Sequence, residues 1–454
     1  MADAFTLANV RKVCRAIVRT VQRSGKAAQG LVIGRDTRFL GERFVAEAAA
    51  ICCEANVPVW VFEDDAPTPL VAFAVVEHHL AGAIMFTASH NPPEYNGIKF
   101  IPEYGGPATA EITSAIEANL AQVTDAPAPE PAPDAVRTIR PNEAYQKHLL
   151  SLVDVDQIRS AGLRIAYDAM FGAGRRILPY VFEGAGLQVE TFNGSRDPLF
   201  GGAMPDPNAD RLQRLREYVV HQGIDIGLAT DGDADRFGVV DSDGRFLSAN
   251  EVLVLIAYHL LEHRGLRGSI VRTVATTHML DRLAQAYGLE CKETPVGFKH
   301  ICEEMRQNQV LIGGEESGGL SVLGHIPEKD GVLANLLVTE LRAFAGRPLR
   351  DVWQDIVAKV GTAVNRRIDM HVPDAAKQQI LAEMKDRPPQ DIDGYAVEDV
   401  STADGVKYRL SGDRWLLLRA SGTEPLMRLY VEAPDQAGME ALANWAMQRI
   451  EAMS

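Results

Sequence analysis

Three aspartates at alternate positions, Asp231, Asp233 and Asp235, follow an apolar run of the chain. Side chains at alternate positions of extended backbone point the same way, so three carboxylate oxygens can converge on one divalent cation. An EF-hand loop begins similarly, but it needs glycine at its sixth position and glutamate at its twelfth, where this chain has Arg236 and Ser242. Few protein ligands leave room for water and phosphate oxygen, which favours Mg²⁺ over Ca²⁺. The alternative to this metal site is a solvated acidic turn.

A serine stands directly after a second apolar run. Ser89 lies in the sequence Thr-Ala-Ser-His-Asn-Pro, residues 87–92, behind the run 82–86. A strand that ends in such a loop presents a hydroxyl group where open α/β sheets hold their ligands, and the Asn-Pro pair prevents a helix from following. We therefore interpret Ser89 as a candidate nucleophile, the alternative being an ordinary polar turn.

A glycine-rich segment with two adjacent glutamates, residues 313–319, follows a third apolar run. Carboxylates and hydroxyls on a flexible loop suit the hydroxyl groups of a sugar, which both donate and accept hydrogen bonds. Adjacent glutamates argue against phosphate as the ligand. The segment is therefore interpreted as a polyol-binding loop, with a plain surface hairpin as the alternative.

Two arginines, Arg419 and Arg428, enclose Ser421, Gly422 and Thr423 between two strand-like runs. Guanidinium groups, hydroxyls and exposed backbone N–H groups together suit a dianion. The segment predicts a phosphate site, and a β-hairpin turn with incidental arginines is the alternative.

In their order and approximate spacing, the four segments resemble those of the α-D-phosphohexomutase family, the phosphoglucomutases and phosphomannomutases. Members of this family move a phosphoryl group between the 1- and 6-positions of a hexose, and the resemblance spans nearly the whole chain. It implies a phosphoserine loop at 87–92, a metal loop at 231–236, a sugar-specificity loop at 314–319 and a phosphate-binding loop at 419–428. Secondary matches lie at 34–38, 95–99 and 294–299.

The resemblance implies a mechanism in which phosphorylated Ser89 donates its phosphoryl group to the sugar. The resulting hexose 1,6-bisphosphate, which also serves as activator, reorients and returns the other phosphoryl group to Ser89. Mg²⁺ held by the three aspartates and by the phosphate on Ser89 would neutralise charge on the transferring group, and Arg236 would orient Ser89 or its phosphate. A general base must take the proton of the incoming hydroxyl, and Lys99, His90 and Lys329 are the candidates.

The sugar loop departs from one branch of the family. Members that act on both mannose and glucose phosphates often carry a histidine where this chain has Gly319, and the segment around Lys329 looks more like the phosphoglucomutase branch. We therefore expect a preference for glucose phosphate, with a phosphomannomutase or dual-specificity mutase as the alternative. The substrate-binding residues that the resemblance implies are Thr294, Gly297, Glu315, Ser317, Arg419, Ser421, Gly422, Thr423 and Arg428.

Rival functions make different demands on the sequence. A hexosamine-phosphate mutase usually has Gln at the position of Glu316. A phosphatase-like hydrolase needs no bisphosphate reorientation, and hence no separate sugar and phosphate loops. A non-catalytic phosphosugar-binding protein could lose both Ser89 and the aspartates. The presence of all these features favours an enzyme.

The beginning of the chain departs from the family pattern. Members usually start with a short strand carrying a Gly-Thr-Asp/Ser-Gly-type segment and an arginine, whereas this sequence reaches a helix cap by Thr6. We hypothesise that the natural start lies upstream, which would restore a sheet-edge strand and one active-site arginine.

Composition narrows the classes of partner. A net charge of -15 argues against nucleic acid and against anionic membrane surfaces. No apolar run reaches the roughly 18 residues of a spanning helix, and the polar start is no signal peptide, so we expect a cytoplasmic protein. Five cysteines without metal-ligand spacing predict core thiols rather than disulfides. The expected partner is a small phosphosugar, and the protein could be a monomer or a homodimer.

The succession of strand-like and helix-like runs, separated by loops and a linker, predicts an α/β fold of four domains. Three related α/β domains with mixed sheets flanked by helices, at 1–140, 141–246 and 247–362, precede a smaller α+β domain at 363–454. A strand-like run ends in one motif in each of the first three domains, which indicates a diverged internal repeat. The proline-rich segment 126–134 predicts a stiff linker closing the first domain. By resemblance, the fourth domain closes over the phosphate and excludes water.

Overall fold

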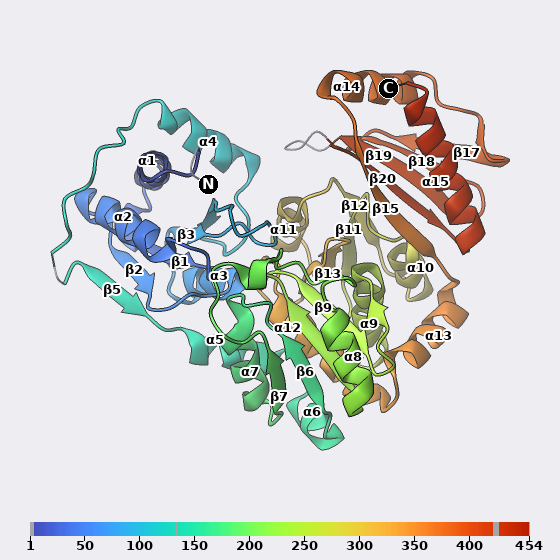
Figure 1. Cartoon of the computed structure of the whole chain (residues 1–454), viewed down its shortest axis with the longest axis horizontal. Helices are drawn as coiled ribbons and strands as arrows, with labels where there is room; N and C mark the ends of the chain where they lie inside the picture. The colour runs from blue at the N-terminus through green and yellow to red at the C-terminus, as the bar shows by residue number, and fades with distance from the viewer. Residues whose placement is uncertain (1–3, 133, 421–425, 454) are drawn as a thin grey trace.

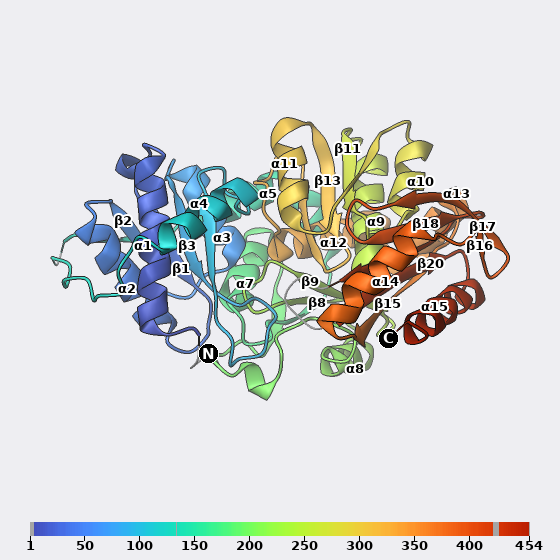
Figure 2. The same ribbon diagram turned by 90° about the horizontal axis from the view of Figure 1, so that it is seen from above.

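A computed structural model describes residues 4–132, 134–420 and 426–453. Four β-sheets follow one another along the chain, each with its own helices (Figure 1). Seen from above in Figure 2, the first domain lies at one end of the molecule and the fourth at the other. The predicted fold class is confirmed: three mixed sheets with helices precede an antiparallel C-terminal domain.

The first sheet has the order β4-β3-β1-β2-β5, in which β4 runs antiparallel to β3 and the other neighbours are parallel. The proline-rich segment does not end this unit, because β5 follows it and returns to pair with β2. The elements are α1 (Leu7–Arg23), η1 (Ala27–Gln29), β1 (Leu31–Arg35), α2 (Gly41–Glu54), β2 (Val59–Phe62), α3 (Thr68–Glu77), β3 (Gly82–Phe86), β4 (Ile98–Pro102), α4 (Ala110–Leu120) and β5 (Val136–Ile139).

The second sheet has the order β10-β9-β8-β6-β7, and it includes Leu247, one residue past the predicted boundary at 246. Strand β9 runs antiparallel to β8, whereas β6 is parallel to both of its neighbours. The elements are α5 (Asn142–Ser151), α6 (Val155–Ala161), β6 (Ile165–Asp168), α7 (Gly174–Gly184), β7 (Val189–Phe192), η2 (Phe200–Gly202), α8 (Gln213–Gln222), β8 (Ile226–Thr230), β9 (Phe237–Asp241) and β10 (Phe246–Leu247).

The third sheet has the order β12-β11-β13-β14, with β14 antiparallel to β13. Its helix α12 is buried all round from Gly331 to Ala343, and the polar Asn335, Glu340 and Arg342 within it are hydrogen-bonded. The elements are α9 (Ala249–Glu262), β11 (Ser269–Thr273), α10 (Met279–Ala286), β12 (Cys291–Thr294), α11 (Phe298–Gln307), β13 (Val310–Glu315), β14 (Gly319–Val322), α12 (Gly331–Ala345) and α13 (Leu349–Val360).

One strand pattern recurs in the first three sheets. The first strand pairs in parallel with the second and the third, and the third then turns back into an antiparallel strand: β3 into β4, β8 into β9 and β13 into β14. The turns between these pairs hold Ser89, the three aspartates and residues 316–318 respectively. Three of the four motifs therefore occupy the same hairpin position in three copies of one unit.

The fourth domain is an antiparallel sheet of order β15-β20-β19-β18-β17-β16 with two helices. Arg419 and Arg428 lie on neighbouring strands, in register with each other, rather than in the turn itself. The elements are β15 (Val364–His371), α14 (Asp374–Asp386), β16 (Asp391–Ile392), β17 (Tyr395–Ser401), β18 (Val406–Leu410), β19 (Arg414–Ala420), β20 (Leu426–Ala433) and α15 (Gln436–Glu451).

The apolar core is shared among the first three domains. One continuous cluster runs from Val32 and Phe73 through Leu178 and Leu228 to Leu337, whereas the fourth domain has its own cluster. A small apolar patch that includes Val274 of the third domain and Trp415 of the fourth joins the two parts. The first three domains therefore form one packed body to which the fourth is attached.

All five cysteines are free, and Cys14, Cys52 and Cys302 are buried. Across the described ranges, every helix is too short or too polar to cross a membrane.

Candidate active site

The loop that carries Ser89 is held by a buried arginine from the segment that follows the neighbouring strand β1. Arg38, which follows β1, has 0% of its surface exposed, and its guanidinium donates to the carbonyl oxygens of Ser89 and Asn91, each at 2.7 Å. It also donates to the carbonyl oxygens of Pro92 at 2.7 Å and Tyr95 at 2.9 Å. Four carbonyls on one guanidinium fix the course of this loop.

Asp36 also supports the loop that carries Ser89, through hydrogen bonds with Arg38 and Thr87. Its Oδ2 accepts from Arg38 Nε at 3.0 Å and from the hydroxyl of Thr87 at 2.7 Å, and that hydroxyl in turn accepts from the backbone N–H of Ser89 at 2.8 Å. Ser89 itself has a φ of 50°, a conformation unusual for a residue with a side chain. The surrounding hydrogen bonds hold the serine in this conformation.

The serine hydroxyl points at the aspartate loop of the second domain. Ser89 Oγ donates to Asp231 Oδ2 at 2.7 Å. The two loops approach so closely that a Cβ atom on Gly232 would lie 2.6 Å from the carbonyl oxygen of Ser89, so glycine is required there. The structure thus brings together two motifs that lie far apart in the sequence.

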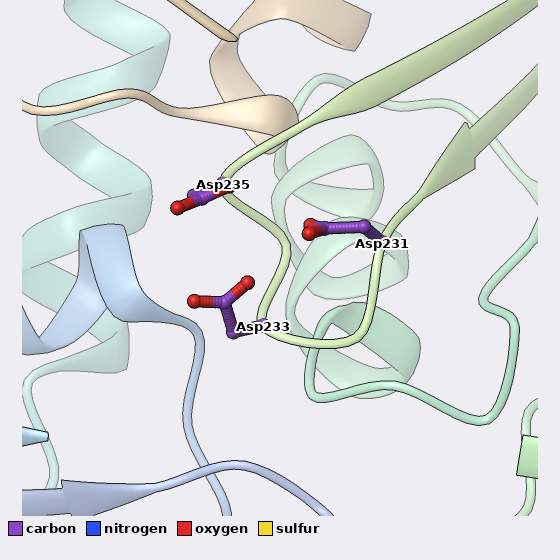
Figure 3. A group of neighbouring side chains, drawn as sticks. All are labelled: Asp231, Asp233 and Asp235. Atoms are coloured by element: carbon purple, nitrogen blue, oxygen red, sulfur yellow. The ribbon is translucent and has the colours of Figure 1, made fainter. Parts of the chain in front are cut away.

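Asp231, Asp233 and Asp235 are fully buried and face a common space in Figure 3, with one oxygen of each within 4.8 Å of the others. Asp233 Oδ1 and Asp235 Oδ1 are buried and have no hydrogen-bond partner among the described residues. Buried carboxylate oxygens without donors carry a desolvation cost that a bound cation would remove. Three convergent carboxylates beside a hydroxyl therefore fit a hard divalent cation such as Mg²⁺.

Two lysines from different domains balance this negative charge. Lys99 of β4 donates to Asp233 Oδ2 at 2.7 Å and to Asp235 Oδ2 at 3.0 Å, and Lys329 of the third domain contacts the same Asp235 oxygen at 3.0 Å. Thr68, at the start of α3, donates its hydroxyl to Asp233 Oδ2 at 2.6 Å. The aspartate loop is thus the meeting point of the first three domains.

Burial and the lysines shift these carboxyl groups in opposite directions. Burial raises the pKa of Asp231, and the neighbouring Asp233 and Asp235 raise it further. For Asp235, burial would raise the pKa, but Lys329 and Lys99 outweigh it and lower the pKa. Asp233 likewise has a lowered pKa, because Lys99 and Thr68 outweigh burial and the charge of Asp235. Asp233 and Asp235 therefore stay charged at neutral pH.

Arg236 and His90, two further predicted catalytic residues, lie beside this cluster. The backbone N–H of Arg236 donates to Asp231 Oδ1 at 3.1 Å, and its Nε is buried without a hydrogen-bond partner among the described residues. The pKa of His90 is lowered to about 4 by burial and by the charge of Arg236. His90 is therefore a neutral imidazole at physiological pH.

The glycine-rich segment is not the flexible loop that its composition predicts. Gly313, Gly314 and Glu315 belong to β13 and Gly319 to β14, so that only residues 316–318 form the turn. A Cβ atom on Gly314 would lie 2.2 Å from the side chain of Leu253, and one on Gly313 would lie 2.3 Å from that of Ile301. These two glycines serve close packing of β13 against helices α9 and α11.

The predicted sugar residues of the third domain lie next to the charged cluster. Glu315 is buried and accepts from the backbone N–H of Gly297 at 3.0 Å; its pKa is raised by burial, against the opposing charge of Lys329. The hydroxyl of Thr294 donates to backbone oxygens, and Ser317 lies in the turn. A pocket of about 390 Å³ joins Gly297 and Glu328 to Lys99, Asp235 and Lys329. The pocket is large enough for a sugar ring, and of the predicted sugar-binding residues Gly297 lines it, whereas Thr294, Glu315 and Ser317 do not.

In the fourth domain, Arg419 donates through Nε to Asp404 Oδ2 at 2.8 Å, and Arg428 lies opposite it on β20. Ser421, Gly422 and Thr423, which the sequence assigns to phosphate binding, lie outside the described residues. Sequence reasoning predicts for Arg38 only a positive charge near the motifs, and it assigns no role to Asp36, Thr68 or Asp404. The first two stand in the segment 34–38 noted as a secondary family match, which was the available signal.

The support of the serine loop predicts a pH dependence. Burial raises the pKa of Asp36 to about 6, although Arg38 and Thr87 oppose the shift. As the pH falls through about 6, Asp36 gains a proton, its ion pair with Arg38 is lost, and turnover should fall. Stability has the opposite sign: a raised carboxyl pKa means that the folded state binds the proton more tightly, so protonation favours folding.

The measurement compares kcat and the free energy of unfolding of the wild type and Asp36→Asn from about pH 8 to about pH 5. As the pH is lowered, the ratio of wild-type kcat to variant kcat should fall. Over the same change, the free energy of unfolding of the wild type should rise relative to that of Asp36→Asn. Because substrate titration affects both proteins equally, a ratio that stays constant would contradict the assignment.

Comparison with known proteins gives the same result along the whole chain. The family models for phosphoglucomutase/phosphomannomutase match residues 1–126 (α/β/α domain I), 143–244 (domain II), 248–360 (domain III) and 368–447 (C-terminal domain).

Relatives that match nearly the whole chain carry more than one substrate name. A phosphoglucomutase/phosphomannomutase of Thermococcus kodakarensis is 30% identical over 94% of this chain and 90% of its own length. A phosphoglucosamine mutase of Solidesulfovibrio magneticus is 30% identical over 93% and 90%. A solved structure from Thermus thermophilus, described as a candidate phosphomannomutase, superposes with a TM-score of 0.87 at 34% identity, covering 99% of this chain and 96% of that one. The chain therefore belongs to the phosphoglucomutase/phosphomannomutase family of the α-D-phosphohexomutase superfamily, and it is a mutase.

Proposed function

We propose that this mutase interconverts hexose 1-phosphate and hexose 6-phosphate, with glucose as the preferred sugar, through a phosphoserine at Ser89. The observation that carries the proposal is the position of Ser89 Oγ, 2.7 Å from Asp231 in a buried cluster of three carboxylates. Phosphoryl transfer needs positioning and charge neutralisation more than covalent chemistry, and this cluster with its two lysines and Arg236 is suited to both.

In the first step the bond between phosphorus and Ser89 Oγ breaks, and a bond forms to a free hydroxyl of the bound hexose phosphate. The hydroxyl proton passes to a base, for which Lys99, His90 and Lys329 are the sequence candidates. The neighbouring aspartates outweigh burial and raise the pKa of both lysines, so each would first have to give up a proton, whereas His90 is already neutral. The hexose 1,6-bisphosphate then reorients, and its other phosphoryl group returns to Ser89 as the proton is given back. A trace of the bisphosphate keeps Ser89 phosphorylated and so acts as activator.

Asp231, Asp233 and Asp235, with a phosphate oxygen on Ser89, would hold Mg²⁺. The bound ion supplies neutralisation of the charge on the transferring group. Arg38 and Asp36 hold the serine, Lys99 and Lys329 hold the aspartates, and Arg236 stands ready to orient the phosphate. Arg419 and Arg428, with Ser421, Gly422 and Thr423, would bind the phosphate that does not react.

The preference for glucose rests on the resemblance of the segment around Gly319 and Lys329 to the phosphoglucomutase branch. Glu315 and Ser317 would hold the 3- and 4-hydroxyls, with Thr294 and Gly297 beside them, but these two hydroxyls have the same configuration in glucose and mannose, so this contact does not select between the two sugars. Phosphoglucosamine is a second candidate because relatives of 30% identity bear that name. Glu316 does not decide between the two by geometry: its Oε2 accepts from the hydroxyls of Thr273 at 3.1 Å and Thr276 at 3.3 Å, which a glutamine oxygen could also do.

The proposal is tested by measuring kcat/KM for glucose 1-phosphate, mannose 1-phosphate and glucosamine 1-phosphate, with Mg²⁺ and a trace of the matching bisphosphate. We expect glucose 1-phosphate to exceed each of the others by about tenfold or more, since one polar substituent on a fitted sugar gives discrimination of this size. Equal rates with mannose 1-phosphate would make the protein a dual-specificity mutase. A preference for glucosamine 1-phosphate would overturn the assignment. Glu316→Gln, measured with the same three substrates, tests whether this residue affects the preference.

A further inference from the structure

Asp404, in the turn between β17 and β18, links the third and fourth domains through a single oxygen atom. Its Oδ2 accepts from Arg419 Nε of its own domain at 2.8 Å and from the backbone N–H of Val296 in the third domain at 2.9 Å. Both side chains of the ion pair are about one-fifth exposed, at 20% for Arg419 and 22% for Asp404. Hydrogen bonds to a charged acceptor are stronger than neutral ones, so this oxygen fixes both donors.

The turn that carries Asp404 is built against the strand that carries Arg419. Gly405 has a φ of 89°, and a Cβ atom there would lie 2.3 Å from the carbonyl oxygen of Leu418 and 3.1 Å from the Cα atom of Arg419. Both the positive φ and the close approach require glycine. Asp404 and Arg419 therefore move together as one unit of the fourth domain.

On the other side of the contact, Val296 directly precedes Gly297, a predicted substrate-binding residue. Both belong to residues 294–299, which we call the sugar segment. The backbone N–H of Gly297 donates to Glu315 Oε1 at 3.0 Å, so the two successive N–H groups of residues 296 and 297 are held by Asp404 and Glu315. A short chain of contacts thus runs from Arg419 of the fourth domain to Glu315 at the end of β13.

We propose that Asp404 is a positioning residue that sets the distance between the phosphate-binding arginine and the sugar-binding segment. The inference rests on the proposed function, in which Arg419 holds the phosphate and Glu315 the sugar of one molecule. A hexose phosphate spans both sites at a fixed length, so it binds well only when the two domains are correctly aligned. Inorganic phosphate has no sugar to align and does not depend on this distance.

The experiment measures the dissociation constants of glucose 1-phosphate and inorganic phosphate by calorimetry on full-length protein carrying Ser89→Ala, so that no turnover occurs. Adding Asp404→Ala should weaken glucose 1-phosphate about tenfold while changing inorganic phosphate less than about twofold. Asp404→Asn should have a smaller effect, because its amide oxygen still accepts from both donors. In protein with Ser89 intact, KM should rise more than kcat falls.

Asp413→Ala is the matched control, because this exposed aspartate of the fourth domain pairs with Arg282 of the third at 3.4 Å, away from the sugar segment. It should leave both dissociation constants unchanged. A merely structural role for Asp404 would lower the melting temperature without changing the ratio of the two constants. An unchanged ratio, or tighter binding of glucose 1-phosphate in Asp404→Ala, overturns the proposal. Wild-type protein that binds the sugar phosphate without turning it over contradicts the mutase chemistry instead, and the comparison of constants still decides the role of Asp404.

Discussion

Ser89→Ala is expected to reduce turnover of glucose 1-phosphate by about 10⁴-fold or more, the scale on which loss of a nucleophile acts. Without Oγ no phosphoserine can form, and the remaining charged groups have nothing to transfer. Hexose 1,6-bisphosphate labelled with ³²P should transfer its label to the wild-type protein but not to the variant. The measurement is a coupled mutase assay together with that labelling.

The fold should survive this change, because the substitution removes one hydroxyl and its single hydrogen bond to Asp231. Ser317→Ala is the matched control: it removes a serine hydroxyl from the sugar turn, so it should raise KM and leave labelling of the protein intact. Turnover by Ser89→Ala within about a hundredfold of the wild type would assign the phosphoryl group to another residue.

Arg38→Met is expected to lower the free energy of unfolding by about 3–5 kcal/mol, the range for leaving one member of a buried ion pair alone. Asp36 would lose its charged partner, and four carbonyl groups of the serine loop would lose their donor. Turnover should fall as well, because Ser89 is no longer held toward Asp231. Chemical denaturation measures the first effect and the rate of Ser89 phosphorylation the second.

Arg43→Met provides the control, since Arg43 is an exposed arginine on the adjacent helix and its loss should change stability by less than about 0.5 kcal/mol. A second variant separates charge from packing. Combining Arg38→Met with Asp36→Asn removes both charges, so the pair should lose less stability than the sum of the single changes. Strict additivity would show that the two side chains do not act as a pair.

The sequence was sufficient to predict the residues whose placement is local. Ser89 and the three aspartates each follow a buried strand, and the end of a strand is visible as the end of an apolar run. The four-domain fold and its repeat followed from the same signal. The predicted roles of Lys99 and Lys329 stay predictions, although the structure places both amines on Asp235.

The sequence could not reveal contacts between segments that lie far apart along the chain. The contacts of Arg38 with residues 89–95 require the register of β1 beside β3, and those of Asp404 require the fourth domain to meet residue 296. Composition also misled at residues 313 and 314, where glycine indicates flexibility in isolation but close packing in the folded protein. Glycine is selected both where a side chain would clash and where the backbone must be flexible, so only the structure shows which of the two reasons applies.

The repeated hairpins have an evolutionary consequence. If one ancestral unit was copied twice, each copy inherited a turn at the same place, and mutation could then specialise the three turns separately. On the proposed function, one became the phosphoryl carrier, one the cation ligand and one a contact for the sugar. Because residues 316–318 form a turn beyond the end of β13, substitutions there can change the substrate range while the other two turns and the stability of the molecule are left intact.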